Sequence, residues 1–444
     1  MIFPRRLLLA CLFLVLLAVH PGAAQPTSGQ PAPAPPSVQT AEPASAAQAY
    51  SLPPDKLAKA IALSRIRNLL DITGSVWGIA FLWILLATRW VAALETWAER
   101  VSRRRWLQGM LFFAAFLLLT ALANLPLDVY GHHVSRAYGI SVEGWAGWLA
   151  DLGKSLGISL LIGAPLLLLF HWIVRRWPRR FWLGAWLITL PLMVLGAFLQ
   201  PLVIDPLFNK FEPLEKTNPA LVQQLEKVVT RTGIDIPPSR MFLMKASAKT
   251  NGLNAYVTGI GTSTRIVVWD TTAGRIPDDE ILFIFAHETG HYVLHHIRKG
   301  LAITAVLLFF GYWACAGFAG WLVRRCGARW GIDSLRSRAG FVVLLLAVSL
   351  AGWLAEPLGN AISRYFEHQA DVYGQEALHG IVPDPQKTAV AAFNALGQAW
   401  LEDPHPSPFI EFWLYNHPST QIRATFAAHY DPWTDGGHGQ YFKH

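Results

Sequence analysis

The stretch FIFAHETGHYVLHH (residues 283–296) contains two histidines, His287 and His291, four positions apart, with Glu288 beside the first. Residues four apart share one face of a helix, so both imidazoles can direct a ring nitrogen at one point. Neutral imidazole binds Zn²⁺ well, and Glu288 is placed to take a proton from water at the metal. The apolar run that begins at Gly300 predicts that this helix leads directly into a membrane span.

A catalytic zinc needs a third protein ligand and an open position for water. A third histidine six residues after the second would stand at position 297, which is Ile297, so that class of zinc site is excluded. The segment NAISRYFEHQADVYG (360–374) has helical character, and its Glu367 is the candidate third ligand. Asp371 lies one turn later on the same face, where it can accept the second ring N–H of a ligating histidine.

Two alternatives remain open for this segment. Glu367 and Asp371 could form a solvated helix face without a metal. His368 could replace Glu367 as the ligand, but it points about a quarter turn away and has no aspartate on its own face. Glu367 is therefore the better candidate.

The composition is that of a membrane protein. Hydrophobic residues make up 53% and charged residues 15% of the 444 residues, which is too apolar for a soluble protein of this size. Six apolar runs approach the ~20 residues that a helix needs to cross a bilayer. They lie at about residues 72–88, 106–125, 156–174, 181–203, 300–323 and 339–358.

Arginine clusters lie in alternate connections between these runs, at 99–105, 175–180 and 324–338. Lys and Arg in short loops favour the cytoplasmic side. Arginines that merely snorkel at span ends would not alternate so regularly. The segments 126–155, 204–299 and 359–444 are therefore expected on the opposite side of the membrane.

The N-terminus has the pattern of an exported protein. Residues 1–24 have a basic start, an apolar stretch and a small-residue end, which predicts a signal peptide or a retained first span. Residues 25–54 are rich in Pro and Ala and nearly uncharged, which predicts a disordered linker. This N-terminus looks bacterial, so we expect an inner-membrane protein whose catalytic domain is periplasmic. The three cysteines offer no disulfide framework.

Between the spans lies a segment of soluble character, residues 204–299. Asn218 can cap a helix that starts at Pro219 and stops at Gly233. SRMFLMKAS (239–247) and NAYVTGIGTSTRIVVWD (254–270) read as strands, the second a hairpin that turns near Gly261 to Ser263.

The expected fold class is mainly α, a polytopic helical membrane protein with a small α+β metallopeptidase domain of gluzincin type. Its expected parts are an N-terminal membrane domain of four spans, a metallopeptidase domain, a hairpin of two spans and a C-terminal part of the catalytic domain. Their ranges are 55–203, 204–299, 300–358 and 359–444.

Several motifs together resemble one known family. IDPLFNKFEPL (204–214), RIVVWDT (265–271), HETGH, NAISRYFEHQAD and NHPS (416–419) occur in the order found in the type 1 CAAX prenyl proteases, which are integral-membrane zinc metallopeptidases. The similarity covers the chain from about residue 55 onward. It implies one Zn²⁺ per chain, bound by His287, His291 and Glu367, with Glu288 as general base.

The resemblance also implies roles that the residues alone do not reveal. Asn254 and His417 would hold the substrate backbone and stabilise the oxyanion, and Arg364 and Asp371 would support the ligands. An enclosed chamber ringed by the spanning helices is a further implication. The run MKASAKTNGLNAY (244–256) departs from that of the eukaryotic members, which changes the expected substrate contacts before Asn254.

The expected reaction is hydrolysis of a peptide bond in peptides and proteins that are membrane-associated or lipidated, including prenylated ones. No nucleic acid is expected as a partner. The main alternative is a non-catalytic quality-control or scaffold protein that retains the protease fold, but such a protein would be expected to lack Glu288 or a ligand. A transporter would be expected to carry more ionisable residues within its spans.

Overall fold

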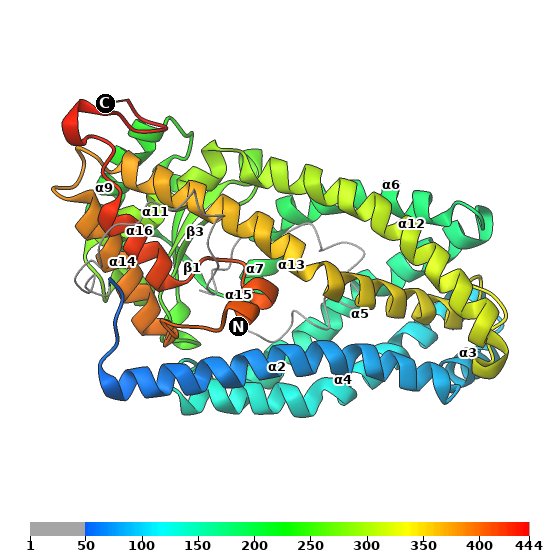
Figure 1. Ribbon diagram of the computed structural model, residues 1–444. Helices are drawn as coiled ribbons and strands as arrows, with labels where there is room; N and C mark the ends of the chain where they lie inside the picture. Colours follow the sequence, from blue (N-terminus) through cyan, green and yellow to red (C-terminus); the bar gives the residue numbers. More distant parts are fainter. Residues whose placement is uncertain (1–48, 444) are drawn as a thin grey trace, which may run out of the picture.

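The computed structural model describes residues 49–443, and within them the chain is mostly helical. Within these residues six helices are long and apolar enough to cross a membrane, as the sequence predicts. They are α2 (Pro54–Ala87), α4 (Arg105–Ala137), α5 (Trp145–Arg176), α6 (Phe181–Leu199), α12 (His296–Trp330) and α13 (Arg338–Ala377). Helix α6 continues through a π-helical turn, η1 (Gln200–Ile204), into α7 (Asp205–Phe208). The long helices run roughly along one axis, with the small sheet at one end of the molecule (Figure 1).

The arginine-rich connections lie at the end remote from the sheet. The short helix α3 (Trp90–Val101) packs there against the turn between α12 and α13 (Figure 1). Arg89 Nε donates to the carbonyl of Arg329 at 2.9 Å, and the backbone N–H of Arg338 donates to Glu95 at 2.8 Å. Arg338 Nη2 also donates to the carbonyl of Arg105 at 3.3 Å, so the basic connections 99–105 and 324–338 contact each other directly.

The sheet contains β1 (Phe211–Pro213), β2 (Met241–Met244), β3 (Ala255–Thr258) and β4 (Arg265–Trp269) in the order β1-β2-β4-β3. Strands β3 and β4 form the expected antiparallel hairpin, which turns through η4 (Gly261–Ser263). Strand β1 pairs antiparallel with β2, and β2 runs parallel to β4. Strand β3 is therefore left at an edge of the sheet.

Helices cover the sheet and complete the domain. The expected helix α9 (Pro219–Thr232) begins at an Asn218 side-chain cap and ends at Gly233, whose φ is +69°. Helix α11 (Asp278–Val293) carries HETGH and starts with three acidic residues, which favour the positive N-terminal end of a helix. The remaining elements are α8 (Leu214–Thr217), η2 (Pro238–Arg240), η3 (Ala246–Ala248), α10 (Asp270–Ala273), α14 (Pro385–Trp400), α15 (Pro408–Leu414), α16 (Thr420–His429) and η5 (Thr434–Gly436).

The two faces of the sheet pack against different partners. Alternate side chains of β3 and β4, such as Val257 and Val268, join a core with α9, α11 and α14. Val267 and Trp269 face the other way, into a second cluster with Leu63 of α2. The sheet thus separates the helix that carries HETGH from the membrane helices on its other face.

Two residues assigned to the linker from sequence are part of the folded core. Tyr50 is fully buried, its hydroxyl donates to the carbonyl of Glu402, and its backbone N–H donates to Gln421. Leu52 is also buried. Helix α2 then begins at Pro54. Tyr50 and Leu52 therefore belong to the folded part of the chain, because an aromatic side chain in a Pro/Ala-rich run can still anchor the chain. The signal segment and the rest of the linker lie outside the described residues.

Candidate metal centre

Helices α11 and α13 approach each other closely through two glycines. A Cβ added to Gly374 would lie 2.8 Å from the backbone nitrogen of His287, and one added to Gly290 would lie 3.0 Å from Cβ of Tyr373. Neither position has room for a side chain. This close approach brings Glu367, on α13, against the two histidines of α11.

The nitrogen and oxygen atoms of these three residues converge on one point. His287 Nε2 and His291 Nε2 are 3.2 Å apart, and the two oxygens of Glu367 lie 3.3 Å from His287 Nε2 and 3.4 Å from His291 Nε2. Ligands about 2.0–2.1 Å from a tetrahedral zinc are separated by roughly 3.3 Å. Glu367 Oε2 is buried and has no hydrogen-bond partner within the described residues. The residues present therefore fit a metal ion with two nitrogen ligands and one carboxylate.

Asp371 and Arg423 support His287 from behind. Asp371 Oδ1 lies 2.8 Å from His287 Nδ1, so it can accept the second ring N–H and leave Nε2 free. Arg423, on α16, donates from Nε and Nη2 to the two oxygens of Asp371 at 2.9 and 2.6 Å. Its guanidinium lies 4.6 Å from the centre of the Phe393 ring. Arg423 is not among the residues that the sequence singles out, and its place on the helix after NHPS is the signal that could have indicated it.

The surroundings shift the pKa values of the site residues in different directions. Burial lowers the pKa of His287, but the nearby carboxylates of Asp371 and Glu367 outweigh burial and raise the pKa to about 9. Burial lowers the pKa of His291 to about 3, which keeps this imidazole neutral. Burial also raises the pKa of Glu288 to about 7, against the opposing effect of His287. A carboxylate with this pKa is suited to exchange protons near neutral pH.

His417 and Asn254 are also buried. His417 Nε2 lies 3.2 Å from Glu367 Oε1, and its Nδ1 lies 2.8 Å from the side-chain oxygen of Asn416. The backbone of Asn254, just before β3, is held by Thr272 and Trp269. The side-chain nitrogen of Asn254 is buried and has no hydrogen-bond partner within the described residues.

Two other residues singled out from sequence do not contact the proposed ligands. Arg364 donates to the carbonyls of Glu411 and Tyr415, at 3.2 and 2.6 Å, and so holds the segment that leads to His417. His368 is exposed and packs its ring against Phe426, 4.7 Å between centroids. It does not belong to the group of possible metal ligands formed by His287, His291 and Glu367.

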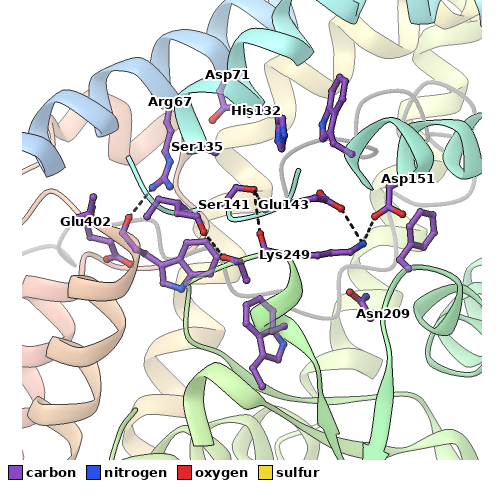
Figure 2. A pocket seen from close by; sticks show the side chains of 18 of the residues that line it. Arg67, Asp71, His132, Ser135, Ser141, Glu143, Asp151, Asn209, Lys249 and Glu402 are labelled. Carbon is purple, nitrogen blue, oxygen red and sulfur yellow. Dashed lines mark hydrogen bonds and ion pairs between the residues drawn. The ribbon is translucent and has the colours of Figure 1, made fainter. Parts of the chain in front are cut away.

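A cavity of about 160 Å³ lies on the other face of the sheet, toward the ends of α2, α4 and α5. Figure 2 shows Lys249 pointing at Glu143 and Asp151, with a distance of 3.7 Å to Glu143 and a closer contact to Asp151. Arg67 donates to the carbonyl of Trp400 at 3.1 Å on the opposite wall. His287, His291 and Glu367 do not line this cavity.

Comparisons with known proteins identify the family of the chain. A family model described as the CAAX prenyl protease N-terminal region with five membrane helices matches residues 37–210, which include α2 to α6. The model of peptidase family M48 matches residues 215–430. A Bacillus subtilis metalloprotease, YhfN, is 34% identical over 84% of this chain and 86% of its own length.

Two further similarities concern the eukaryotic proteins. The CAAX prenyl protease 1 of Saccharomyces cerevisiae is 34% identical over 72% of this chain and 71% of its own length. The crystal structure of S. mikatae Ste24p superposes with a TM-score of 0.72, covering 84% of this chain and 89% of that one at 24% identity. At that identity, the structural match establishes a shared fold.

Proposed function

The chain belongs to peptidase family M48 and is a multi-pass membrane metalloprotease, and from this premise we propose that it is a zinc endopeptidase. We propose His287, His291 and Glu367 as the zinc ligands and Glu288 as the general base. The observation that carries the proposal is the convergence of two Nε2 atoms and one carboxylate at 3.2–3.4 Å. Asp371 acts through His287, because the carboxylate holds the imidazole with Nε2 directed at the metal point.

When bound, zinc supplies a Lewis acid that acidifies water and polarises the scissile carbonyl. Glu288 then accepts the proton of the attacking water and later donates it to the leaving amine. Its pKa of about 7 suits both steps, since the group gains and loses a proton near neutral pH. Glu288 directly follows His287 on α11, and its carboxylate accepts a hydrogen bond from the backbone of Val257 on β3, which opposes the effect of burial on its pKa.

His417 and Asn254 are proposed to contact the substrate. The Nε2 atom of His417 reaches the metal-binding group, so it lies where negative charge develops on the substrate carbonyl oxygen. The unpartnered amide nitrogen of Asn254 can donate to a substrate carbonyl. Strand β3 follows directly and is an edge strand, which a peptide can extend through backbone hydrogen bonds. Backbone recognition of this kind tolerates many substrate sequences.

Arg364 supports this arrangement indirectly. By holding the carbonyls of Glu411 and Tyr415, its guanidinium fixes the approach to His417. We also propose that residues 204–299 and 359–444 form one catalytic unit, because their apolar side chains share a single core.

The substrates are peptides or proteins, and we propose that membrane-associated or lipidated chains, including prenylated ones, are among them. The names of the yeast and other CAAX prenyl protease 1 relatives support this class. We further propose a bacterial inner-membrane location with the catalytic side in the periplasm, which the arginine clusters at the remote end support. Fusion of alkaline phosphatase to the C-terminus should then give periplasmic activity, and a fluorescent C-terminal green fluorescent protein fusion would contradict the orientation.

The experiment that tests the function compares wild type with Glu367→Ala after purification in detergent. Metal content is measured by elemental analysis, and cleavage is measured on a farnesylated peptide and on the same peptide without the lipid. We expect about one zinc per wild-type chain, lost together with cleavage in the variant. Zinc absent from wild type, with neither peptide cut after zinc is supplied, would favour a scaffold protein instead.

A further inference from the structure

A chain of polar contacts continues behind His291, on the side away from the proposed metal. His296 Nδ1 lies 3.1 Å from His291 Nδ1, and His296 Nε2 lies 3.1 Å from the side-chain oxygen of Gln369. The amide nitrogen of Gln369 lies 3.4 Å from the hydroxyl of Tyr365. The series crosses three helices, because His291 belongs to α11, His296 to α12 and Gln369 to α13.

The position of His296 is tightly constrained by the fold. It is the first residue of α12, only 4% exposed, and its ring stacks on Phe366 at 4.4 Å with 7° between the planes. The preceding residue, His295, has a φ of +60°, a left-handed conformation that interrupts the helix between α11 and α12. This left-handed turn lets the ring of His296 fold back against His291. A histidine in a strained turn sequence is thus placed where its nitrogens face two polar partners.

The direction of these hydrogen bonds determines whether His291 can bind a metal. If the oxygen of Gln369 accepts from His296 Nε2–H, then neutral His296 presents a lone pair at Nδ1. His291 must donate its own Nδ1–H to that lone pair, which leaves His291 Nε2 without a proton and free to bind. This is the tautomer that a ligating histidine requires.

The reverse direction blocks the site. If the Gln369 amide were turned so that its nitrogen donated to His296 Nε2, then His296 Nδ1 would carry the proton. His291 would have to accept at Nδ1 and would carry its proton at Nε2, the atom that faces Glu367. The orientation of one amide therefore selects between a competent and an incompetent ligand.

We propose that His296 and Gln369 are positioning residues that hold His291 in its metal-binding tautomer. Their role for His291 corresponds to the role of Asp371 for His287. The two histidines are nevertheless supported by different chemistry, since a charged carboxylate holds His287 and a neutral series holds His291. This inference rests on the metal site proposed above.

The test uses substitutions of Gln369 that have opposite hydrogen-bonding capacity, because this side chain is only half buried and tolerates replacement. Gln369→Glu provides only acceptors and enforces the competent direction, whereas Gln369→Lys provides only donors and enforces the other. Zinc dissociation constants are measured on the full-length protein by competition with a chelator. We expect Gln369→Glu to bind at least as tightly as wild type and Gln369→Lys to bind about 10- to 100-fold more weakly.

The effect of charge on zinc affinity must be separated from the effect of hydrogen-bond direction. The exposed neighbour His368 offers this control, since His368→Glu and His368→Lys carry the same charges without reaching His296. We expect these two variants to differ from each other by less than the Gln369 pair. An equal difference at both positions would mean that only electrostatic attraction is at work and would overturn the proposal.

His296 is tested directly by His296→Phe, which keeps the aromatic stack on Phe366 and removes the acceptor. We expect a 10- to 100-fold loss of zinc affinity and an altered visible spectrum of the cobalt-substituted protein. His295→Asn, at the exposed and tolerant turn position, is the control and should match wild type. Wild-type zinc affinity in both His296→Phe and Gln369→Lys would overturn the inference, whereas wild type that bound no zinc would overturn the proposed function itself. If His296→Phe does not fold, the Gln369 pair decides the question.

Discussion

Replacing Gly374 by alanine adds one methyl group at the closest approach of the two helices that carry the proposed metal ligands. The new Cβ would lie 2.8 Å from the nitrogen, 3.0 Å from Cα and 3.2 Å from Cβ of His287. Carbon atoms in favourable contact are about 3.5–4.0 Å apart. Two of the three contacts involve backbone atoms, so no side-chain rotation can relieve them and the helices must move apart.

The size of that movement sets the expected effect. Restoring ordinary contacts requires a separation of roughly 0.5 Å or more, whereas metal–ligand distances in a working site hold within about 0.2 Å. Overpacking of this kind costs about 1–3 kcal/mol. If this free energy is lost from the bound state, zinc affinity falls by about 5- to 140-fold, since about 1.4 kcal/mol corresponds to a factor of ten.

The assay is zinc binding by chelator competition, with thermal unfolding followed in parallel. Gly359→Ala is the matched control, because Gly359 lies on the same helix and a Cβ there meets no atom within 4 Å. We expect the control to retain wild-type affinity and to be slightly more stable, since alanine favours helix more than glycine does. Wild-type zinc affinity and stability in Gly374→Ala would refute the account of the close helix contact.

Three further outcomes follow from the buried charges. Burial raises the pKa of Glu288 to about 7, and the base must be ionised, so kcat/KM should fall as pH drops through about 7. The variant Glu288→Gln should keep its zinc and lose cleavage by at least ~100-fold. Burial likewise raises the pKa of Glu402 to about 7, so the folded state holds a proton that the unfolded state releases near 4.5, and stability should fall as pH rises across that window. Glu402→Gln should remove this pH dependence and raise stability at pH 8 by up to about 3 kcal/mol, measured by thermal unfolding. Arg423→Met leaves the buried Asp371 without its cation and should cost roughly 3–5 kcal/mol in the same assay, with Arg423→Lys intermediate; an unchanged melting temperature would contradict the importance of this ion pair.

Features with a regular period or a dense local motif were predictable from sequence. The six spans follow from length and apolarity, and the β3–β4 hairpin follows from two apolar runs around Gly261. The order of the sheet was not predictable, because β1 and the parallel β2–β4 pair depend on contacts between distant segments. Strand β1 is also only three residues long, which is too short for an alternating pattern to show.

The predicted site residues belong to a local sequence motif, whereas the missed ones act through contacts between distant positions. His287, Glu288 and His291 form a pattern within five residues, whereas Arg423 contacts Asp371 across 52 positions and has no motif of its own. His296 is visible in the sequence as a third nearby histidine, but its spacing fits no known ligand pattern. The sequence alone therefore assigns it no role. Only the turn at His295 shows that its ring faces His291 rather than the metal.

The proposed metal centre is assembled from both the soluble and the membrane-spanning parts of the chain. Helix α11 supplies two donors, but Glu367 lies on α13, a 40-residue helix that continues from a membrane span. His296 opens α12, the other helix of that hairpin. Because ligand distances tolerate only about 0.2 Å, the packing of α12 and α13 in the bilayer acts directly on metal binding. A soluble fragment limited to residues 204–299 would keep HETGH but lack Glu367, so the proposed metal site needs the hairpin as well as α11.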